Sequence, residues 1–464
     1  MSKSLRLPAL CALLLAATSF TFSSAPSGLS YDSVATMLLE AGLRNCEAFE
    51  MLKELTSQAP HRLSGSKGAA KAVDLAKQMM LQRGFDNVHL ETVTVPHWVR
   101  GPVEEAMITR SAAKRGTSLT VCALGGSIAT PKNGIEGEVV EVRSLDEAKA
   151  LGGSAKNKII FYNRAFDPTK LNTFEAYGGA VDQRSRGAIA AARVGAVAVL
   201  VRSMTDVIDD VPHTGMMNYA DTVKKIPAAA ISTLDAEMLS RLLSSEKSVR
   251  VRLKLSCQTL QDAPSANVVG EITGSEKPNE IIVVGGHLDC WDKGQGAHDD
   301  GAGCVQAIEV VNLIKKLGLR PKRTIRAVMF MNEENGNRGG KAYPDAPERS
   351  GEKHVAMIES DRGGFAPRGI TVQADSSVLP KVQQWSSLFE RPNAGRIQSG
   401  YSGVDVFPTV ERGVPGFGLD VESHRYFDYH HSDNDTIDKV NPRELEMGAI
   451  VEALLCWLIS EEGL

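Results

Sequence analysis

GGHLD at residues 285–289, followed by DDGAG at residues 299–303, is the stretch of this 464-residue chain that decides its fold. The apolar run 281–286 predicts a strand that ends at His287, and the run 302–317 predicts a helix with apolar residues along one side. The polar residues between them therefore stand at the carboxyl end of a strand. Sites in sheets of alternating strands and helices form at that end.

His287 and Asp289 are spaced to act together. In an extended strand, side chains two positions apart project to the same side, so the Asp289 carboxylate can accept a hydrogen bond from the His287 imidazole. That contact would leave the other ring nitrogen free to bind a metal ion. A solvated surface pair is the alternative for an isolated His-x-Asp, so other residues must decide between the two.

Asp299 and Asp300 lie in a glycine-rich loop where the predicted helix begins. Acids at a helix N-terminus also serve as caps and interact favourably with the helix dipole. A cap does not account for two acids next to Gly301 and Gly303, where the missing side chains let the backbone approach a ligand closely. We therefore expect one of the two aspartates to bridge a pair of metal ions.

Glu333 and Glu334 follow the apolar run 324–331 and precede Gly336. Neighbouring side chains of a strand point to opposite faces, so both glutamates can face one cleft only where the strand ends. One carboxylate can then bind a metal ion while the other takes a proton from a metal-bound water. A solvated acidic turn is the alternative for these two residues.

Two further segments carry the same residue types. Asp361 follows the apolar run 355–360, and His430 and His431 stand together in an aromatic segment. Each could be a surface feature by itself, but acids and imidazoles at successive strand ends jointly predict a metal-dependent hydrolase. Mixed histidine and carboxylate ligands suit zinc, with manganese or cobalt as possible substitutes.

The chain from residue 265 onward predicts the α/β class. Further strands are expected at 369–373 and 414–419, and a closing helix at 442–460. Such alternation of strands and helices predicts a mainly parallel mixed sheet flanked by helices on both faces.

The region before the inserted segment is predicted to be scaffold. It has a helical pattern at 34–56, a second helix that Ser66 caps and that ends near Gln82, and a strand at 88–95. The stripe expected to be buried on the second helix consists of Val73, Met80 and Leu81.

Residues 125–256 differ in character and are predicted to form an inserted domain. They contain strand patterns at 137–142, 158–162 and 226–231, and an alanine-rich helix that turns at Gly195 into a buried strand. No cluster of chemically active residues is evident there. The rest of the mature chain, residues 26–124 and 257–464, is then one discontinuous domain.

Residues 1–25 have the layout of a secretory signal peptide: a basic start, an apolar run and small residues. No later run reaches the length of apolar chain that a membrane anchor requires. The 52 Lys and Arg against 56 Asp and Glu, a net charge of −4, exclude a nucleic-acid or anionic-membrane surface as the main partner. The seven cysteines show no CxxC spacing, which argues against a zinc knuckle or a dense disulfide framework.

Four motifs together resemble the M28 family of co-catalytic zinc exopeptidases. They are His287-Leu288-Asp289, the loop 294–303, Asn332-Glu333-Glu334 and Tyr429-His430-His431-Ser432. The resemblance extends from the loop 61–66 to the last helix. It implies the zinc exopeptidase fold with an inserted protease-associated-like domain, and two zinc ions per chain.

The same resemblance implies a division of the ligands between the two ions. His287 and Asp361 would bind one zinc ion, and Glu334 and His431 would bind the other. Asp299 would bridge the two.

The remaining roles also follow from the resemblance. Glu333 would be the general base, and Asp289 would orient His287. The peptide between Asp299 and Asp300 would be cis, and Asp300 would make no contact with metal. His430, Tyr429 or Tyr401 could donate a hydrogen bond to a tetrahedral oxyanion.

The expected activity is that of an exported carboxypeptidase or dipeptidase that hydrolyses short peptides with free termini. An aminopeptidase of broader specificity is the alternative with the same chemistry, and a non-catalytic binding module on the same fold is the alternative from another class. The expected partners are short peptide substrates, and the resemblance implies a second copy of the chain in a homodimer. An extracellular, a lysosome-like and a periplasmic location all fit export.

Overall fold

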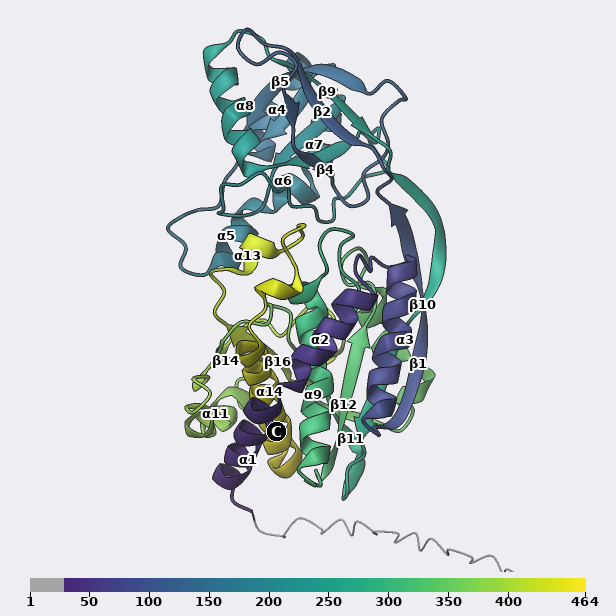
Figure 1. The fold of residues 1–464 in the computed structure, drawn as a ribbon, viewed down its shortest axis with the longest axis vertical. Helices are drawn as coiled ribbons and strands as arrows, with labels where there is room; N and C mark the ends of the chain where they lie inside the picture. Colours follow the sequence, from purple (N-terminus) through teal and green to yellow (C-terminus); the bar gives the residue numbers. More distant parts are fainter. Residues whose placement is uncertain (1–28) are drawn as a thin grey trace, which may run out of the picture.

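Residues 29–464 are described by the computed structural model, and the predicted signal peptide at residues 1–25 lies outside them. Two eight-stranded sheets, one above the other in Figure 1, divide the described chain into two units. We call residues 29–99 and 258–464 the main unit, and residues 100–257 the inserted unit. The long antiparallel strands β1 (Asp86–Val99) and β10 (Gln258–Ile272) form a ribbon that joins them.

The main-unit sheet has the order β1-β10-β12-β11-β13-β16-β14-β15. Its central strands β12, β11, β13 and β16 are parallel, whereas β10 and β14 run antiparallel to their inner neighbours. The fold class predicted from the sequence is therefore confirmed. The strands not yet given are β11 (Lys277–His287), β12 (Arg323–Phe330), β13 (Lys353–Glu359), β14 (Pro367–Gln373), β15 (Arg396–Ser399) and β16 (Gly416–Val421).

Helices cover both faces of this sheet. The alternating side chains of β11 show the two faces: Ile282 and Val284 belong to the large core, whereas Ile281 and Val283 pack with Tyr343 and other residues on the opposite side. The first face carries α3 (Lys67–Gln82), α9 (Ala302–Lys316) and α14 (Pro442–Glu462), with α1 (Tyr31–Asn45) and α2 (Glu47–Gln58) packed on α9 and α14. Shorter helices lie elsewhere around the sheet: α10 (Arg338–Ala342), α11 (Val378–Gln383) and α12 (Phe407–Val410).

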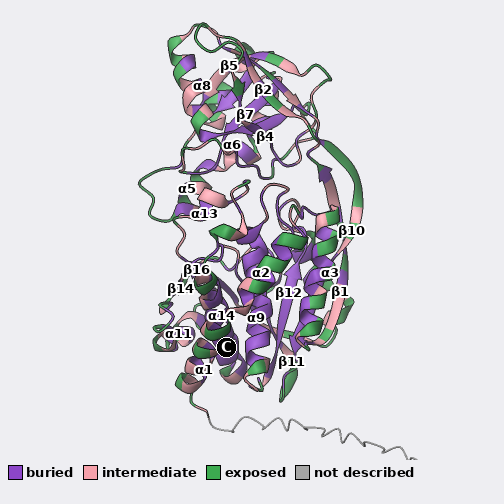
Figure 2. Cartoon of the chain, viewed as in Figure 1, coloured by how far each residue is buried: buried purple, intermediate pink, exposed green. Residues whose placement is uncertain are grey.

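Helix α9 is buried along most of its length, as its purple colour in Figure 2 shows. Strands β11 and β12 lie on one side of it, and α2 and α14 lie on the other. Polar residues are therefore also enclosed, and Gln306 donates a hydrogen bond to the Leu445 carbonyl at 2.9 Å. The sequence pattern predicted only one buried stripe, because it carries no information about a second helical layer.

The predicted helix at 34–56 is wrong in one respect: it is two helices. Cys46 has the left-handed backbone angles φ 47° and ψ 47°, which end α1 and let α2 begin in a new direction. The helix capped by Ser66 is confirmed, since its hydroxyl accepts a hydrogen bond from the Ala69 N–H at 3.0 Å. Within that helix, however, Leu81 is 47% exposed rather than part of the buried stripe.

The inserted unit begins earlier than the predicted boundary at residue 125. Its sheet has the order β3-β2-β9-β5-β6-β7-β8-β4, and β2, β3 and β4 all precede that residue. Long-range pairing of β2 with β9 closes the unit, and such pairing leaves no local mark in the sequence. The strands are β2 (Glu104–Arg110), β3 (Ser118–Leu119), β4 (Val121–Ala123), β5 (Ile135–Val142), β6 (Ile159–Tyr162), β7 (Ala198–Arg202), β8 (Ala228–Ile231) and β9 (Arg250–Leu255).

The helices of the inserted unit reach toward the main unit. Helix α5 lies beside the short main-unit helix α13 (Tyr426–Tyr429) in Figure 1. The predicted turn at Gly195 is present, with φ 82°, between α7 and β7. The helices of this unit are α4 (Leu145–Ala150), α5 (Thr173–Ala180), α6 (Asp182–Ser185), α7 (Gly187–Arg193) and α8 (Thr233–Ser245). No helix within residues 29–464 has the length and apolar character needed to cross a membrane.

Candidate metal centre

The five residues predicted to bind metal lie together at the carboxyl ends of the central parallel strands. His287 ends β11, Glu334 follows β12, and Asp361 follows β13. Asp299 lies in the turn before α9, and His431 follows α13. Parallel strands that end at one edge of the sheet explain why segments far apart in the sequence meet there.

Asp299 stands between the two histidines. Its Oδ1 lies 3.2 Å from Nε2 of His287, and its Oδ2 lies 3.2 Å from Nε2 of His431. On the His287 side, Oδ1 of Asp361 is 3.5 Å from the same imidazole nitrogen. On the His431 side, Oε2 of Glu334 is 3.0 Å from Nε2. The arrangement has two halves that share one carboxylate.

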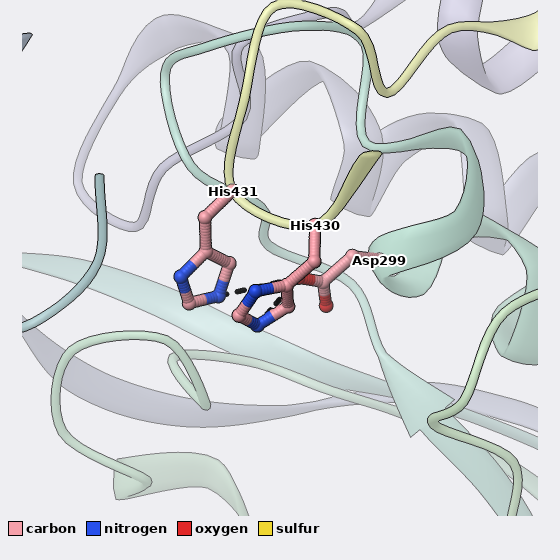
Figure 3. A group of neighbouring side chains, drawn as sticks. All are labelled: Asp299, His430 and His431. Atoms are coloured by element: carbon pink, nitrogen blue, oxygen red, sulfur yellow. Dashed lines mark ion pairs between the residues drawn. The ribbon is translucent and has the colours of Figure 1, made fainter. Parts of the chain in front are cut away.

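His430, which was expected only as a possible hydrogen-bond donor to the oxyanion, also lies close enough to Asp299 to be a candidate ligand. Figure 3 shows its ring stacked on that of His431 beside Asp299. The two ring centroids are 3.5 Å apart. Its Nε2 lies 3.8 Å from Oδ2 of Asp299, and one donor atom from each of the three residues lies within 4.8 Å of the others. The sequence feature that pointed to His430 was its position directly before His431.

The loop that carries Asp299 is held by hydrogen bonds to its backbone. Asp435 accepts from the backbone N–H groups of His298 at 2.7 Å and Asp299 at 3.1 Å. Asp300 accepts from the His287 N–H at 3.0 Å and from the Gly303 N–H at 2.9 Å. The Asp299–Asp300 peptide is cis, as the resemblance implies.

Asp289 supports His287 in a different way from the one predicted. The Nδ1–H group of His287 donates to the backbone carbonyl of Asp289 at 3.0 Å, not to its carboxylate. The carboxylate Oδ1 instead accepts from the N–H groups of Asn332 at 2.6 Å and Glu333 at 3.1 Å. The chain turns after β11, so the extended geometry behind the prediction no longer holds at Asp289. The Asp289 carboxylate therefore links the loop after β11 to the loop that carries the glutamates.

Arg62 was not identified as part of the site, but it fixes the loop between His287 and Asp299. Its guanidinium donates to the carbonyls of Leu288, Gln295 and Gly296 at 2.6, 2.6 and 2.7 Å. The arginine is fully buried. The Arg62 guanidinium is thus used for hydrogen bonds to backbone carbonyls and not for binding a substrate.

The two histidines are strongly biased toward the protonated form when no metal is bound. Burial opposes protonation of His287, but Asp361 and Asp299 outweigh it and raise its pKa well above the ordinary value. For His431, burial is likewise outweighed by Glu334 and Asp299, which raise the pKa to about 9. Burial would raise the pKa of Asp299, but the close imidazoles of His287 and His431 hold that pKa well below its usual range.

In contrast to Asp299, the two neighbouring glutamates have raised pKa values. Burial raises the pKa of Glu333 well above its usual value, and the negative charges of Asp361 and Glu334 add to this rise. Burial also raises the pKa of Glu334 to about 7, although His431 partly offsets it. Several carboxylates crowded out of water in one place require compensating positive charge.

The centre fits a pair of divalent metal ions. Oxygens of three predicted ligands are buried and have no hydrogen-bond partner within residues 29–464: Oδ2 of Asp299, Oε1 of Glu334 and Oδ1 of Asp361. Leaving such atoms unpaired is costly, and since these carboxylates also face imidazole nitrogens, they are suited to bind cations. Imidazole nitrogens together with carboxylate oxygens are ligands that zinc accepts.

A cleft of about 350 Å³ opens over the centre. Its floor includes Asp299, Glu333 and Glu334 from the main unit. The inserted unit supplies part of its wall through Phe174, Tyr177, Arg184 and Met216. None of these four residues was predicted as functional, because the sequence of the inserted unit shows no motif.

Comparisons with known proteins agree with this centre. Residues 267–455 match Peptidase family M28. Carboxypeptidase Q from Mus musculus is 36% identical over 93% of this chain and 90% of its own length, and carboxypeptidase Q from Homo sapiens is 37% identical over 89% and 85%.

Solved structures show the same architecture. The Peptidase M28 precursor from Shewanella amazonensis SB2B superimposes with a TM-score of 0.88 at 36% identity, covering 93% of this chain and 96% of that one. The zinc aminopeptidase BSAP from Bacillus subtilis, at 20% identity, shares the fold with a TM-score of 0.62 over 88% and 93% of the two chains.

The chain therefore belongs to peptidase family M28, and it is a metallopeptidase that acts as an exopeptidase. Within that family it is similar to carboxypeptidase Q over nearly its whole length.

Proposed function

We propose that this protein is an exported di-zinc exopeptidase that cleaves short peptides, chiefly dipeptides with both termini free. The observation that carries the proposal is the position of Asp299, whose two oxygens each lie 3.2 Å from a different histidine. In this proposal His287 and Asp361 would hold one ion, Glu334 and His431 would hold the other, and Asp299 would contribute to both sites. Similarity to carboxypeptidase Q supports the short-peptide specificity.

The proposed chemistry is hydrolysis by an activated water. Bound zinc would polarise the scissile carbonyl and lower the pKa of that water. Glu333 borders the cleft but forms no ion pair within 4 Å among residues 29–464, so its carboxylate is free to accept the proton. Its backbone N–H is fixed by Asp289 at 3.1 Å. Glu333 would then deliver the proton to the leaving amine.

His430 is placed to assist in one of two ways. Its Nδ1 is buried without a hydrogen-bond partner in the described chain, and burial together with the positive field of His431 lowers the pKa of His430 well below its ordinary value. A neutral imidazole can bind metal or donate one hydrogen bond. We assign to His430 the role of hydrogen-bond donor. Oε2 of Glu334, which is 3.0 Å from Nε2 of His431, already supplies the second ligand on that side of the centre.

Export and assembly belong to the same proposal. The signal-peptide pattern at residues 1–25 supports delivery to an extracellular, lysosome-like or periplasmic space. Resemblance to the family supports a homodimer and a protease-associated-like inserted unit.

Two measurements test the proposed function: the number of zinc ions needed for activity and the range of peptides cleaved. Enzyme stripped by a chelator and titrated with zinc should recover full activity at about two ions per chain. A library of dipeptides should contain good substrates. Full activity with one bound ion would contradict the shared position of Asp299, and retained cleavage of an N-acetylated dipeptide would exclude the aminopeptidase alternative.

A further inference from the structure

His298 is a buried histidine that plays no part in the proposed chemistry. It is 1% exposed and directly precedes Asp299, the carboxylate that lies between the two histidines of the centre. It is not among the residues of the described chain that line the cleft. Its contacts must therefore account for a polar ring buried at this position.

The His298 ring packs against the rings of Phe365 and Tyr429. The centroid of the Phe365 ring is 4.2 Å from that of His298, and the two planes are 8° apart. The Tyr429 centroid is 5.3 Å from that of His298, with 10° between the planes. We call these three nearly parallel rings the ring cluster.

Each ring of the cluster belongs to a segment that carries a predicted metal ligand. The pairs of ring and ligand are His298 with Asp299, Phe365 with Asp361, and Tyr429 with His431. Asp361 belongs to one half of the centre and His431 to the other, while Asp299 is shared by both. The ring cluster thus connects the segments that hold both halves.

A hydrogen bond gives the contact with the Asp361 loop a fixed direction. The Gly364 N–H donates to Nδ1 of His298 at 3.2 Å, so the neutral ring carries its proton on Nε2. Gly363 has φ 81°, and a Cβ atom there would lie 2.7 Å from the Phe365 ring and 3.1 Å from Nδ1. The missing side chain lets this loop turn tightly over the imidazole.

The bond to Gly364 makes a connection that the other contacts of the turn do not make. Asp435 accepts hydrogen bonds from the backbone of His298 and Asp299, and this ties the turn before α9 to the segment after His431. Nδ1 of His298 ties the same turn to the loop after β13. The position of Asp361 relative to Asp299 therefore depends on the His298 side chain.

We propose that His298 is a positioning residue that fixes Asp361 relative to the shared carboxylate of Asp299. It would thereby set the affinity of the ion that His287 and Asp361 hold in the proposed function, on which the inference rests. Outer groups that orient metal ligands typically contribute a factor of about 10 to 100 to metal affinity. A shift of the Asp361 loop should affect the ion on its own side and spare the other.

His298→Phe separates the hydrogen bond from the ring packing. Phenylalanine keeps a flat ring beside Phe365 and Tyr429 but offers no acceptor to the Gly364 N–H. In chelator-stripped protein, the affinity for one of the two zinc ions should fall about 10- to 100-fold, and the other affinity should change by less than about threefold. Competition with a zinc chelator measures both affinities. X-ray diffraction at the zinc edge, at limiting zinc, should show that the weakened ion is the one beside Asp361.

His298→Asn makes the opposite change. An amide oxygen can still accept the hydrogen bond from Gly364, but the flat ring between the other two aromatic side chains is lost. This variant should keep most of the zinc affinity that His298→Phe loses, while its melting temperature falls further. A role in packing alone would give the reverse order of zinc affinities.

His354→Phe is the matched control. His354 lies in β13, the strand that leads to Asp361, and its Nε2 is 3.1 Å from the Tyr343 hydroxyl on the other face of the sheet. Loss of this hydrogen bond should lower the melting temperature and leave both zinc affinities unchanged.

Three results would overturn the inference. Unchanged zinc affinities in His298→Phe would show that the bond to Gly364 does not position Asp361. Equal weakening of both ions in that variant, or similar weakening in His354→Phe, would show a general loss of stability. Lower zinc affinity in His298→Asn than in His298→Phe would assign the effect to packing.

The behaviour of wild-type protein separates this inference from the proposed function. Two bound zinc ions without cleavage of any dipeptide would overturn the proposed specificity, and the selective loss of one ion in His298→Phe would still support the positioning role. Fewer than two bound ions in wild-type protein would overturn the proposed two-ion centre, and the role of His298 with it.

Discussion

Buried acids gather in two places in the main unit. The metal-centre acids are the buried Asp299 and Glu334 with the partly buried Asp361, and the helix-layer acids are Glu309 on α9 with Glu446 and Glu452 on α14. The metal-centre acids face histidines. Both groups contain carboxylate oxygens without a hydrogen-bond partner within the described chain. The helix-layer acids have no histidine partner within 4 Å in residues 29–464.

Asp299 and the helix-layer acids prefer different charge states. Burial raises the pKa of Glu309 to about 7 and that of Glu446 to about 8, and it raises the pKa of Glu452 well above the ordinary value. At Asp299 the close imidazoles of His287 and His431 reverse the effect of burial and lower the pKa. Burial of an acid therefore does not by itself mark a site. At Asp299 the two imidazoles make the difference, whereas Glu334, which faces His431 alone, keeps a pKa raised to about 7.

The strongest test of this contrast removes the shared carboxylate. Asp299→Asn should lower kcat/KM at least about 1000-fold, because loss of a direct ligand exceeds the roughly 10- to 100-fold cost of losing an outer partner. Bound zinc per chain should fall in parallel, as measured by atomic spectroscopy. Wild-type zinc content with wild-type activity would refute the bridging position.

Glu333→Gln and Glu446→Gln make the same chemical change in the two regions. Glu333→Gln should lower kcat about 10²- to 10⁴-fold while zinc content and folding are retained, because only the proton acceptor is lost. Glu446→Gln should leave kcat unchanged. Undiminished hydrolysis by Glu333→Gln would disprove its role as the base.

Substitutions of Asp289 test how His287 is oriented. Asp289→Ala should lower zinc affinity about 10- to 100-fold by freeing the backbone of Asn332 and Glu333. Asp289→Asn should recover most of that affinity, because an amide oxygen can still accept these hydrogen bonds and the backbone carbonyl still holds His287. Equal losses in both variants, measured by competition with a zinc chelator, would instead favour a charged contact with the imidazole.

The smallest expected effect is on the free energy of unfolding, in Glu446→Gln. The pKa of Glu446 is raised in the folded protein to about 8, so the fold prefers its protonated form, and the cost of ionisation grows as pH rises from its ordinary pKa toward 8. Glu446→Gln should therefore stabilise the protein at pH 9 by at least about 1.4 kcal/mol, the value of one pKa unit. At pH 4.5 the change should be near zero. Thermal unfolding at both pH values measures it, and equal shifts would contradict the titration.

The sequence was sufficient to predict most of the main unit and the residues that gather at its centre. Strand patterns before His287, Glu333 and Asp361 are local, and parallel strands bring their ends to one edge. The break at Cys46 was not predictable, because an ordinary residue there adopts left-handed angles with no glycine to indicate it. The start of the inserted unit was missed because the pairing of β2 with β9 joins distant segments.

By itself, then, the sequence determined the class of fold, the family and the chemical groups available for metal binding, because these depend on local periodicity and on residue types in fixed order. Only the tertiary structure decided that the Asp289 carbonyl orients His287, that His430 stacks on His431, and that Arg184 of the inserted unit lies 3.4 Å from Nδ1 of His431. These three features arise where the chain turns or where two units meet. Their geometry depends on contacts between residues far apart in sequence, which no local pattern records.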